Sequence, residues 1–214
     1  MSQLTESLGD FGDGLLTTVE LAGASFLGAV VVALVVVTCR IVPVRPLRLF
    51  GTAYVELFQS IPLLLWLALV FFALPEIGVE FSGFASVVLA SSLYQGSYYA
   101  EAIRTGVNSV SKGQAEAARA LGMSTRQLLT TIVLPQAFRT TVQPLTNVTI
   151  TLVLETALAA TVGLLDLTEA ANRINFRTAE PILVYTGAGL CYAAMAVVIS
   201  TIGGRLERKM VIHR

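Results

Sequence analysis

The sequence predicts an all-α integral membrane protein with five transmembrane helices, and three observations support that fold class. The chain of 214 residues is 55% hydrophobic and only 13% charged, whereas about a quarter of the residues in an average soluble domain are charged. Its mean hydropathy is +0.75. Long apolar stretches recur along the chain, and Lys and Arg gather in alternate connections between them. These features indicate a chain that lies in lipid.

Five stretches reach or approach the length of about 20 mostly apolar residues that a helix needs to cross the hydrocarbon core. The third and fourth are more polar than the others. Pro62 falls inside the second, where it is expected to kink the helix. The whole chain, residues 1–214, then forms one membrane domain, with predicted spans at residues 14–39, 49–74, 83–105, 142–164 and 181–204.

Two segments outside these spans are expected to be helical. Residues 1–13 suit a short surface helix ahead of the first span. Residues 166–180 are polar and long enough for one outer helix, and Pro181 then opens the fifth span at a favoured first-turn position.

The distribution of basic residues predicts the orientation of the chain. All but two of the 14 Lys and Arg residues fall on one side of the five-span arrangement, and the exceptions are Arg173 and Arg177. Because basic residues accumulate on the cytoplasmic side, the N-terminus is expected outside and the C-terminus inside. The connection between the third and fourth spans, residues 111–135, also lies inside. The net charge is zero, which gives no reason to expect a nucleic-acid partner.

This inner connection carries signals for two short helices. Ser111-x-x-Gln114 and Ser124-x-x-Gln127 both match the capping box, in which the hydroxyl and the amide side chain satisfy free backbone donors. Gly122 lies between them and is suited to end the first helix in the left-handed conformation. The sequence therefore predicts a helix–turn–helix along the inner face of the membrane.

The same connection has the spacing EAA-x3-G-x9-I-x-LP. This spacing resembles the signature loop of the permease subunits of binding-protein-dependent ABC importers. The alternative is a well-capped inner loop in which Glu116 only aids capping. The ATPase-coupling residues that the resemblance assigns are Glu116, Ala117, Ala118, Gly122, Ile132, Leu134 and Pro135.

Other segments resemble the polar amino acid subfamily of these permeases, which carries histidine-, glutamate-, glutamine- or arginine-type substrates. They are Gly14-Leu-Leu-Thr-Thr-Val, Tyr54-Val-Glu-Leu-Phe-Gln-Ser-Ile-Pro-Leu-Leu, Glu101-Ala-Ile-Arg104, Lys112-Gly-Gln-Ala-Glu-Ala-Ala, Leu134-Pro-Gln-Ala and residues 147–167.

The resemblance implies an ATP-driven importer for a polar or charged amino acid in a bacterial cytoplasmic membrane. Each loop would dock on a cytoplasmic ATPase subunit that holds ATP and Mg, and an extracytoplasmic binding protein would deliver the amino acid. The chain would pair with itself or with a sibling permease. It contains no G-x4-G-K-[ST] phosphate-binding loop, so it is expected to be a transport subunit and not an enzyme.

Two departures bear on substrate charge and on pairing. The subfamily usually reads Phe-Arg-Gly-Thr-Pro-Leu-Leu, whereas this chain has Gln59-Ser60-Ile61 before Pro62. Leu154-Glu155-Thr156-Ala157-Leu158 stands where Lys-Asp-Thr-Ser-Leu is usual. Two basic positions are therefore lost. That loss slightly favours an asymmetric pair with a sibling over a homodimer.

Two stripes of polar residues within the apolar helices predict a substrate pathway. Polar residues inside a membrane are costly and commonly face a bundle interior or a watery cavity. One stripe lies on the third span and the other on the fourth, at three- and four-residue steps. The candidates are Tyr94, Gln95, Tyr98, Asn147, Thr151 and Glu155.

Each polar candidate has a structural alternative. Glu101 and Arg104 are three residues apart near the inner boundary, and a structural ion pair is the favoured interpretation. Tyr94 and Tyr98 also suit packing. Glu155 has no basic neighbour at helical spacing, so it is expected to contact a substrate ammonium, pair across the dimer or take up a proton.

Two other functions remain open from sequence. One is an ABC importer permease for another small polar solute. The other is a self-sufficient channel or secondary transporter that uses Glu155 as its ion site, against which stand the short five-span length, the lack of an inverted repeat and the docking loop. Neither a nucleophile–base pair nor a metal-type spacing is visible.

Overall fold

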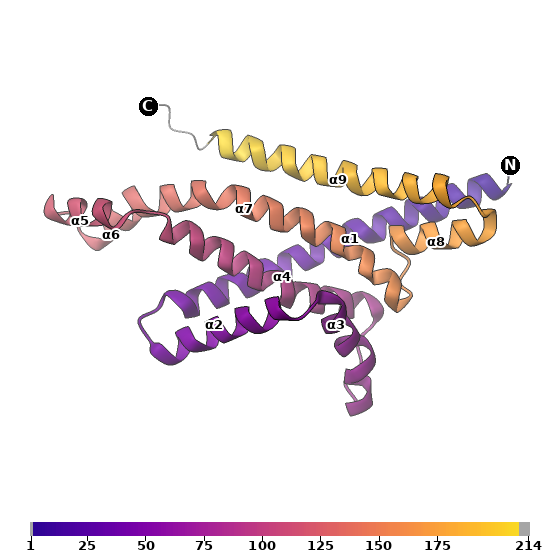
Figure 1. Ribbon diagram of the computed structural model, residues 1–214, viewed down its shortest axis with the longest axis horizontal. Helices are drawn as coiled ribbons and strands as arrows, with labels where there is room; N and C mark the ends of the chain where they lie inside the picture. Colours follow the sequence, from indigo (N-terminus) through magenta and orange to yellow (C-terminus); the bar gives the residue numbers. More distant parts are fainter. Residues whose placement is uncertain (1, 210–214) are drawn as a thin grey trace.

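The structure, a computed structural model, describes residues 2–209 and is helical, with no strand in that range. The helices form an elongated bundle with α5 and α6 at one end and α8 beside the N-terminus at the other (Figure 1). The α-helices are α1 (Ser2–Ile41), α2 (Arg45–Ser60), α3 (Leu63–Ala68), α4 (Gly83–Asn108), α5 (Lys112–Ala120), α6 (Thr125–Leu128), α7 (Leu134–Glu155), α8 (Leu167–Thr178) and α9 (Pro181–Lys209). The π turns are η1 (Leu69–Ala73) and η3 (Leu129–Val133), and the 3-10 turns are η2 (Leu74–Ile77) and η4 (Thr156–Val162).

Within residues 2–209, three helices are long and apolar enough to cross a membrane: residues 9–41, residues 125–162 and α9. The α2–α3 pair would make a fourth if it is one broken span. Helix α4 has 26 residues but is more polar, as the sequence predicted for the third span. The chain is thus a membrane protein, and the count of five spans stays a prediction.

Close contact between α1 and α4 forms the centre of the bundle. Ala29, Ala33 and Ala100 are at most 1% exposed, which lets the two helices approach closely. A Cβ atom added at Gly96 of α4 would lie 2.5 Å from Val32 Cγ1 of α1. Small residues commonly allow membrane helices to pack in this way because dispersion contacts, not a hydrophobic driving force, hold them together.

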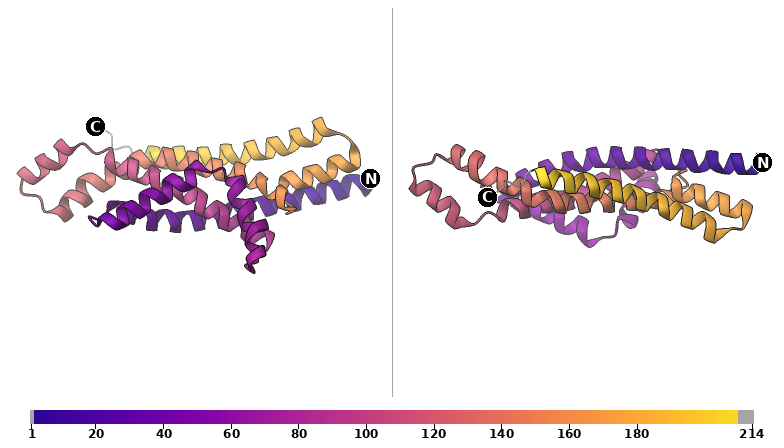
Figure 2. Two further views of the ribbon diagram at one scale, coloured as in Figure 1. Left: turned by 60° about the horizontal axis from the view of Figure 1, so that its bottom comes forward. Right: turned by 90° about the horizontal axis from the view of Figure 1, so that it is seen from above.

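The second predicted span bends at Pro62 as expected, but the bend is a complete break of the helix. Helices α2 and α3 meet at an angle of 98°, with Ile61 in an extended conformation. Proline removes a helical donor and disfavours the α conformation of the residue before it. The Trp66 ring stacks on Phe58 across the break, with centroids 4.4 Å apart. The segment after Pro62 therefore projects from the bundle (Figures 1 and 2).

Two predicted boundaries also differ from the structure. The first helix is continuous from Ser2 to Ile41, so residues 1–13 are not a separate surface helix. The second of the two short helices predicted in the inner connection is not a separate element, because residues 125–162 run on as one helical segment through η3. Pro135 lies in the first turn of α7, where a missing N–H is tolerated.

A buried carboxyl group joins three helices at the N-terminal end of the bundle. Asp166 is 0% exposed and caps α8 by accepting a hydrogen bond from the Glu169 amide at 2.9 Å. It also accepts one from the Tyr192 hydroxyl of α9 at 3.1 Å. The adjacent Leu167 amide donates to Thr18 of α1 at 3.0 Å. Burial raises the pKa of Asp166 above its ordinary value.

Replacing Gly96 with alanine is expected to destabilise the bundle. The new Cβ would meet Val32 at 2.5 Å, and overpacking of this kind costs about 1–3 kcal/mol. The measurement is the apparent melting temperature of the purified protein in detergent. Gly23→Ala is the matched control on the partner helix, because nothing lies within 4 Å of its added Cβ. Equal melting temperatures for the two variants would contradict the close α1–α4 contact.

The raised pKa of Asp166 predicts a pH dependence of stability. Because the folded state holds the proton more tightly, the stability that this group contributes is full below the unfolded value of about 3.9 and is lost as pH rises through the raised folded pKa. Asp166→Asn removes this titration. Its melting temperature should therefore rise relative to wild type between about pH 4 and pH 8.

The control for this titration is Asp13→Asn, which changes an exposed carboxylate of α1. This variant should follow the wild-type curve. A difference between Asp166→Asn and wild type that stays constant with pH would refute the linkage.

Candidate functional site

The two predicted polar stripes line a single cavity between α4 and α7. The cavity has a volume of about 220 Å³, and none of the seven residues around it is basic. One wall comes from α4 and the other from α7, with Val148 as the apolar member. The polar lining residues are Tyr94, Gln95, Tyr98, Asn147, Thr151 and Glu155. The structure thus brings all six pathway candidates together, while their contact with a substrate stays a prediction.

Glu155 is held in this cavity by a buried amide. The Gln95 side chain is 1% exposed and donates a hydrogen bond from Nε2 to Glu155 Oε2. On the same wall the hydroxyl oxygens of Tyr94 and Tyr98 lie 3.2 Å apart and share a hydrogen bond. Gln95 therefore fixes the position of the carboxylate.

The position of Glu155 favours a cation. It is the last residue of α7, after which the chain tightens into the 3-10 turn η4. The C-terminal end of an α-helix carries a partial negative charge from its aligned carbonyl groups. A carboxylate placed there adds to that charge, and no lining residue is basic. The cavity can therefore stabilise an ammonium group and would repel an anion.

Glu101 and Arg104 form the predicted ion pair, and the structure adds a second arginine. Arg104 Nη2 lies 2.7 Å from Glu101 Oε1. Arg40 Nη1 of α1 lies 2.5 Å from Glu101 Oε2, and its side chain is only 8% exposed. A Cβ atom at Gly51 of α2 would lie 2.7 Å from Arg40 Cγ. Sequence reasoning missed Arg40 because 61 residues separate it from Glu101; its place at the end of an apolar helix was the one available signal.

The turn between α5 and α6 has the left-handed glycine that the sequence predicted. Gly122 has φ +78°. The Ser124–Gln127 capping box is complete, with both reciprocal hydrogen bonds present. At Ser111 only half of the predicted box forms: its hydroxyl accepts from the Gln114 amide. The Gln114 side chain instead accepts a hydrogen bond from Gln136 Nε2 at 2.9 Å and so joins α5 to α7.

The predicted coupling residues differ in exposure. Ala118 is 2% exposed and packs inward, whereas Glu116, Ala117, Gly122 and Pro135 are exposed. Ile132 is half-buried, and Leu134 is 47% exposed. Leu121, which the motif does not include, is 82% exposed beside the turn.

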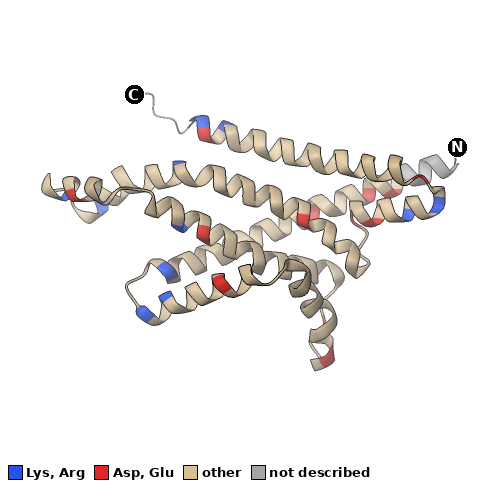
Figure 3. Ribbon diagram, in the orientation of Figure 1, with Lys and Arg blue, Asp and Glu red and all other residues tan. Residues whose placement is uncertain are grey.

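Most basic residues lie toward the end of the bundle that holds α5, α6 and the end of α9 (Figure 3). Arg173 and Arg177 lie on α8, at the opposite end. Each is paired with an acid, Arg173 with Glu169 at 2.9 Å and Arg177 with Asp10. This separation agrees with the charge asymmetry from which the orientation was predicted.

Comparison with known proteins identifies the family. The model of the binding-protein-dependent transport system inner membrane component matches residues 24–212. A probable glutamine ABC transporter permease protein of Bacillus subtilis (strain 168) is 34% identical over 210 residues, 98% of this chain and 97% of the relative. An L-cystine transport system permease protein of the same organism is 35% identical and covers 92% of this chain and 85% of the relative.

A solved structure agrees with these relatives. The crystal structure of an amino acid ABC transporter with histidines contains a chain that is 28% identical to this one and superposes with a TM-score of 0.89, covering 96% of both chains. The chain therefore belongs to the family of binding-protein-dependent transport system inner membrane components.

Proposed function

We propose that this chain is the permease subunit of an ABC importer for a polar or charged amino acid in a bacterial cytoplasmic membrane. The observation that carries the proposal is the polar cavity between α4 and α7, built from six polar side chains of these two helices. Relatives named for glutamine and cystine transport support the substrate class. The chain crosses the membrane five times, with the N-terminus outside.

The cavity chemistry suggests how an amino acid binds. Glu155 accepts the substrate ammonium, because its carboxylate adds to the negative end of α7 and meets no basic side chain in the cavity. Asn147 and Thr151 supply further polar contacts from the same helix. The two tyrosine hydroxyls complete the opposite wall. Selectivity among amino acids is shared with the binding protein that delivers them.

A second permease subunit closes the cavity. The cavity opens at the surface of this single chain, and polar groups that face hydrocarbon cost several kcal/mol each. Pairing with a sibling permease, or with another copy, removes that cost and places the pathway between the two subunits. Polar side chains at the midplane between helices are a common arrangement in transporters.

The turn between α5 and α6 couples the permease to ATP hydrolysis on another polypeptide. That ATPase subunit holds ATP and Mg and receives Leu121 and the exposed residues around Gly122 in a surface groove. Because α6 continues without a break into α7, which carries Glu155, a movement of the docked turn is transmitted along one helix to the substrate cavity. Access then alternates between the two sides of the membrane.

Glu155→Gln is expected to weaken transport by loss of the ammonium contact. A hydrogen bond to a charged group contributes about 1.5–3 kcal/mol, so the substrate concentration for half-maximal uptake should rise at least about tenfold. The measurement is uptake into vesicles that contain the whole importer and its binding protein.

The control is Glu180→Gln, which alters an exposed acid between α8 and α9. It should leave uptake unchanged. An unchanged half-maximal concentration in Glu155→Gln would remove Glu155 from the substrate site.

Gly122→Val is expected to uncouple the permease from its ATPase. A β-branched residue at φ +78° is strongly disfavoured, so the turn must change shape and displace Leu121. Co-purification of the ATPase subunit and uptake should both be lost, while the amount of protein in the membrane stays the same. Gly113→Ala, a change within α5 with open space around it, is the control. Normal ATPase association in Gly122→Val would rule out docking at this turn.

A further inference from the structure

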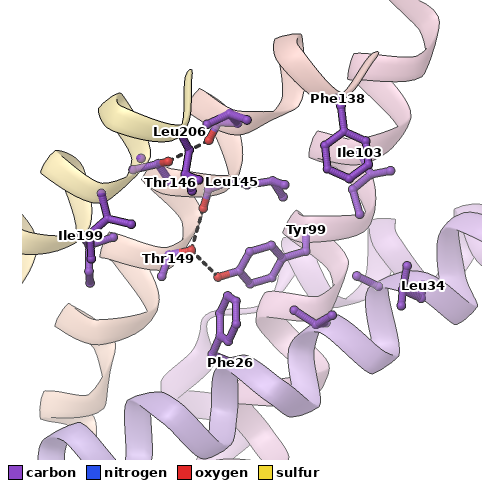
Figure 4. A pocket seen from close by; sticks show the side chains of 15 residues that line it. Phe26, Leu34, Tyr99, Ile103, Phe138, Leu145, Thr146, Thr149, Ile199 and Leu206 are labelled. Atoms are coloured by element: carbon purple, nitrogen blue, oxygen red, sulfur yellow. Dashed lines mark hydrogen bonds between the residues drawn. The ribbon is translucent and has the colours of Figure 1, made fainter. Parts of the chain in front are cut away.

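A long apolar groove runs between α1, α7 and α9. Its first part has a volume of about 570 Å³ and its second about 520 Å³. Phe26, Thr149 and Ile199 line both parts, so the two are continuous. Figure 4 shows the first part, with Phe26 and Tyr99 on one side and Ile199 and Leu206 on the other.

The groove and the polar cavity lie on different faces of the same helix pair. Successive residues of an α-helix point about 100° apart. Thr149 lines the groove, whereas Asn147 and Thr151, each two positions away, line the polar cavity. On α4, Tyr99 lines the groove while its neighbour Tyr98 lines the cavity. One side of the α4–α7 pair is therefore polar and the other apolar.

This division decides what occupies the groove. The polar cavity requires a protein partner, because its side chains cannot face hydrocarbon. In a closed dimer each subunit uses one patch for its partner, and the apolar groove lies on the other side of α7. Several of its side chains are well exposed, among them Leu34 (55%), Phe138 (66%) and Ile202 (52%). Exposed apolar side chains need no hydrogen-bonding partner in hydrocarbon, so a lipid acyl chain can fill the groove.

The length of the groove suits one acyl chain. The first part extends along α9 from Leu206 to Ile199, which at 1.5 Å per residue is about 10 Å. The second part continues to Cys191, giving about 22 Å in all. One leaflet of the hydrocarbon core is about 15 Å thick. A chain that enters near Leu206 therefore fills the first part and reaches into the second.

Basic residues border the end of the groove near Leu206. Arg139 follows Phe138 on α7, and Lys209 lies three positions after Leu206, on the same side of α9. Both are exposed, and neither forms an ion pair with another residue whose side chain the structure describes. A cation next to the end of an apolar groove at the cytoplasmic side is complementary to an anionic lipid headgroup.

We propose that an anionic phospholipid of the inner leaflet binds here, with one acyl chain in the groove and its phosphate beside Arg139 and Lys209. The site goes beyond amino acid transport but rests on the proposed orientation and pairing. The side chains of Tyr99 and Thr149 form the base of the groove. Their hydroxyl groups are joined by a hydrogen bond of 2.7 Å, which Figure 4 shows. The lipid thereby packs against the same two helices that hold the polar cavity.

Photocrosslinking in the assembled importer tests the site. A benzophenone amino acid replaces Ile202 in the groove or, as the matched control, Val197 of the same helix, which is 64% exposed and outside the groove. The vesicles contain equal amounts of phosphatidylglycerol and phosphatidylcholine. Mass spectrometry should find adducts at Ile202 enriched in phosphatidylglycerol and adducts at Val197 in the bulk ratio.

Charge variants separate a bound lipid from bulk lipid. Arg139→Gln and Lys209→Gln should each lower the enrichment about fivefold, the factor that corresponds to roughly 1 kcal/mol per basic residue near an anionic headgroup. Arg45→Gln, at the exposed start of α2, should leave it unchanged. Equal lipid ratios at Ile202 and Val197 would overturn the proposal, and so would a crosslink from Ile202 to another protein chain.

Failure of the lipid site is distinguishable from failure of the transport proposal. Substrate-stimulated ATP hydrolysis and uptake are measured on the same preparations. Bulk lipid ratios at Ile202 with normal uptake would refute only the lipid site. Loss of the amino acid function would instead appear as absent uptake in the unmodified importer, whatever the crosslinks show.

Discussion

The cost of placing polar groups in hydrocarbon governs most of this structure. A charged side chain at the bilayer centre costs at least about 2.5–3.5 kcal/mol when it has no partner. Each acid on the surfaces of α4 and α7 that face the interior of the bundle accordingly accepts a hydrogen bond from another side chain of the protein. Glu155 accepts from Gln95, and Glu101 is held by Arg40 and Arg104. These contacts fix the relative positions of α1, α4 and α7 and leave the polar cavity between α4 and α7 open.

Small residues make those polar contacts possible. Gly96 on α4 and Gly28 on α1 sit where an added Cβ would clash with Val32 and Ser92 of the facing helix. The close approach keeps α4 at the centre of the bundle although it is too polar to qualify as a span by composition. Helix α4 is thus surrounded by α1, α2, α3 and α7, and its face that carries Tyr94 and Tyr98 lines the open polar cavity.

The sequence predicted the features that depend on local spacing. Helical periodicity is enough to place Gln95 and Glu155 on stripes, and the left-handed turn at Gly122 follows from a glycine between two caps. Contacts between distant segments were not predictable from one sequence. Arg40 could not be assigned to Glu101, and the Gln114 side chain was assigned to a cap although it reaches α7. The right-angle break at Pro62 also depends on how the flanking helices pack.

The continuity of α6 with α7 changes how the inner turn relates to the cavity. Two separate loop helices would transmit a movement at Gly122 through flexible joints and lose much of it. A single helical segment from residue 125 to residue 162 moves more nearly as one body, with the turn between α5 and α6 at one end and Glu155 near the other. The π turn at residues 129–133 is the point along this segment where the hydrogen-bond pattern departs from the α-helix, and such turns are frequent at functional sites. Bending is therefore most easily absorbed there, between the turn and the cavity, while Pro144 lies farther along the helix, close to the cavity. In the proposed coupling to an ATPase subunit, the strength of coupling should depend on these two places more than on the intervening apolar residues, because helix bends concentrate at π turns and prolines.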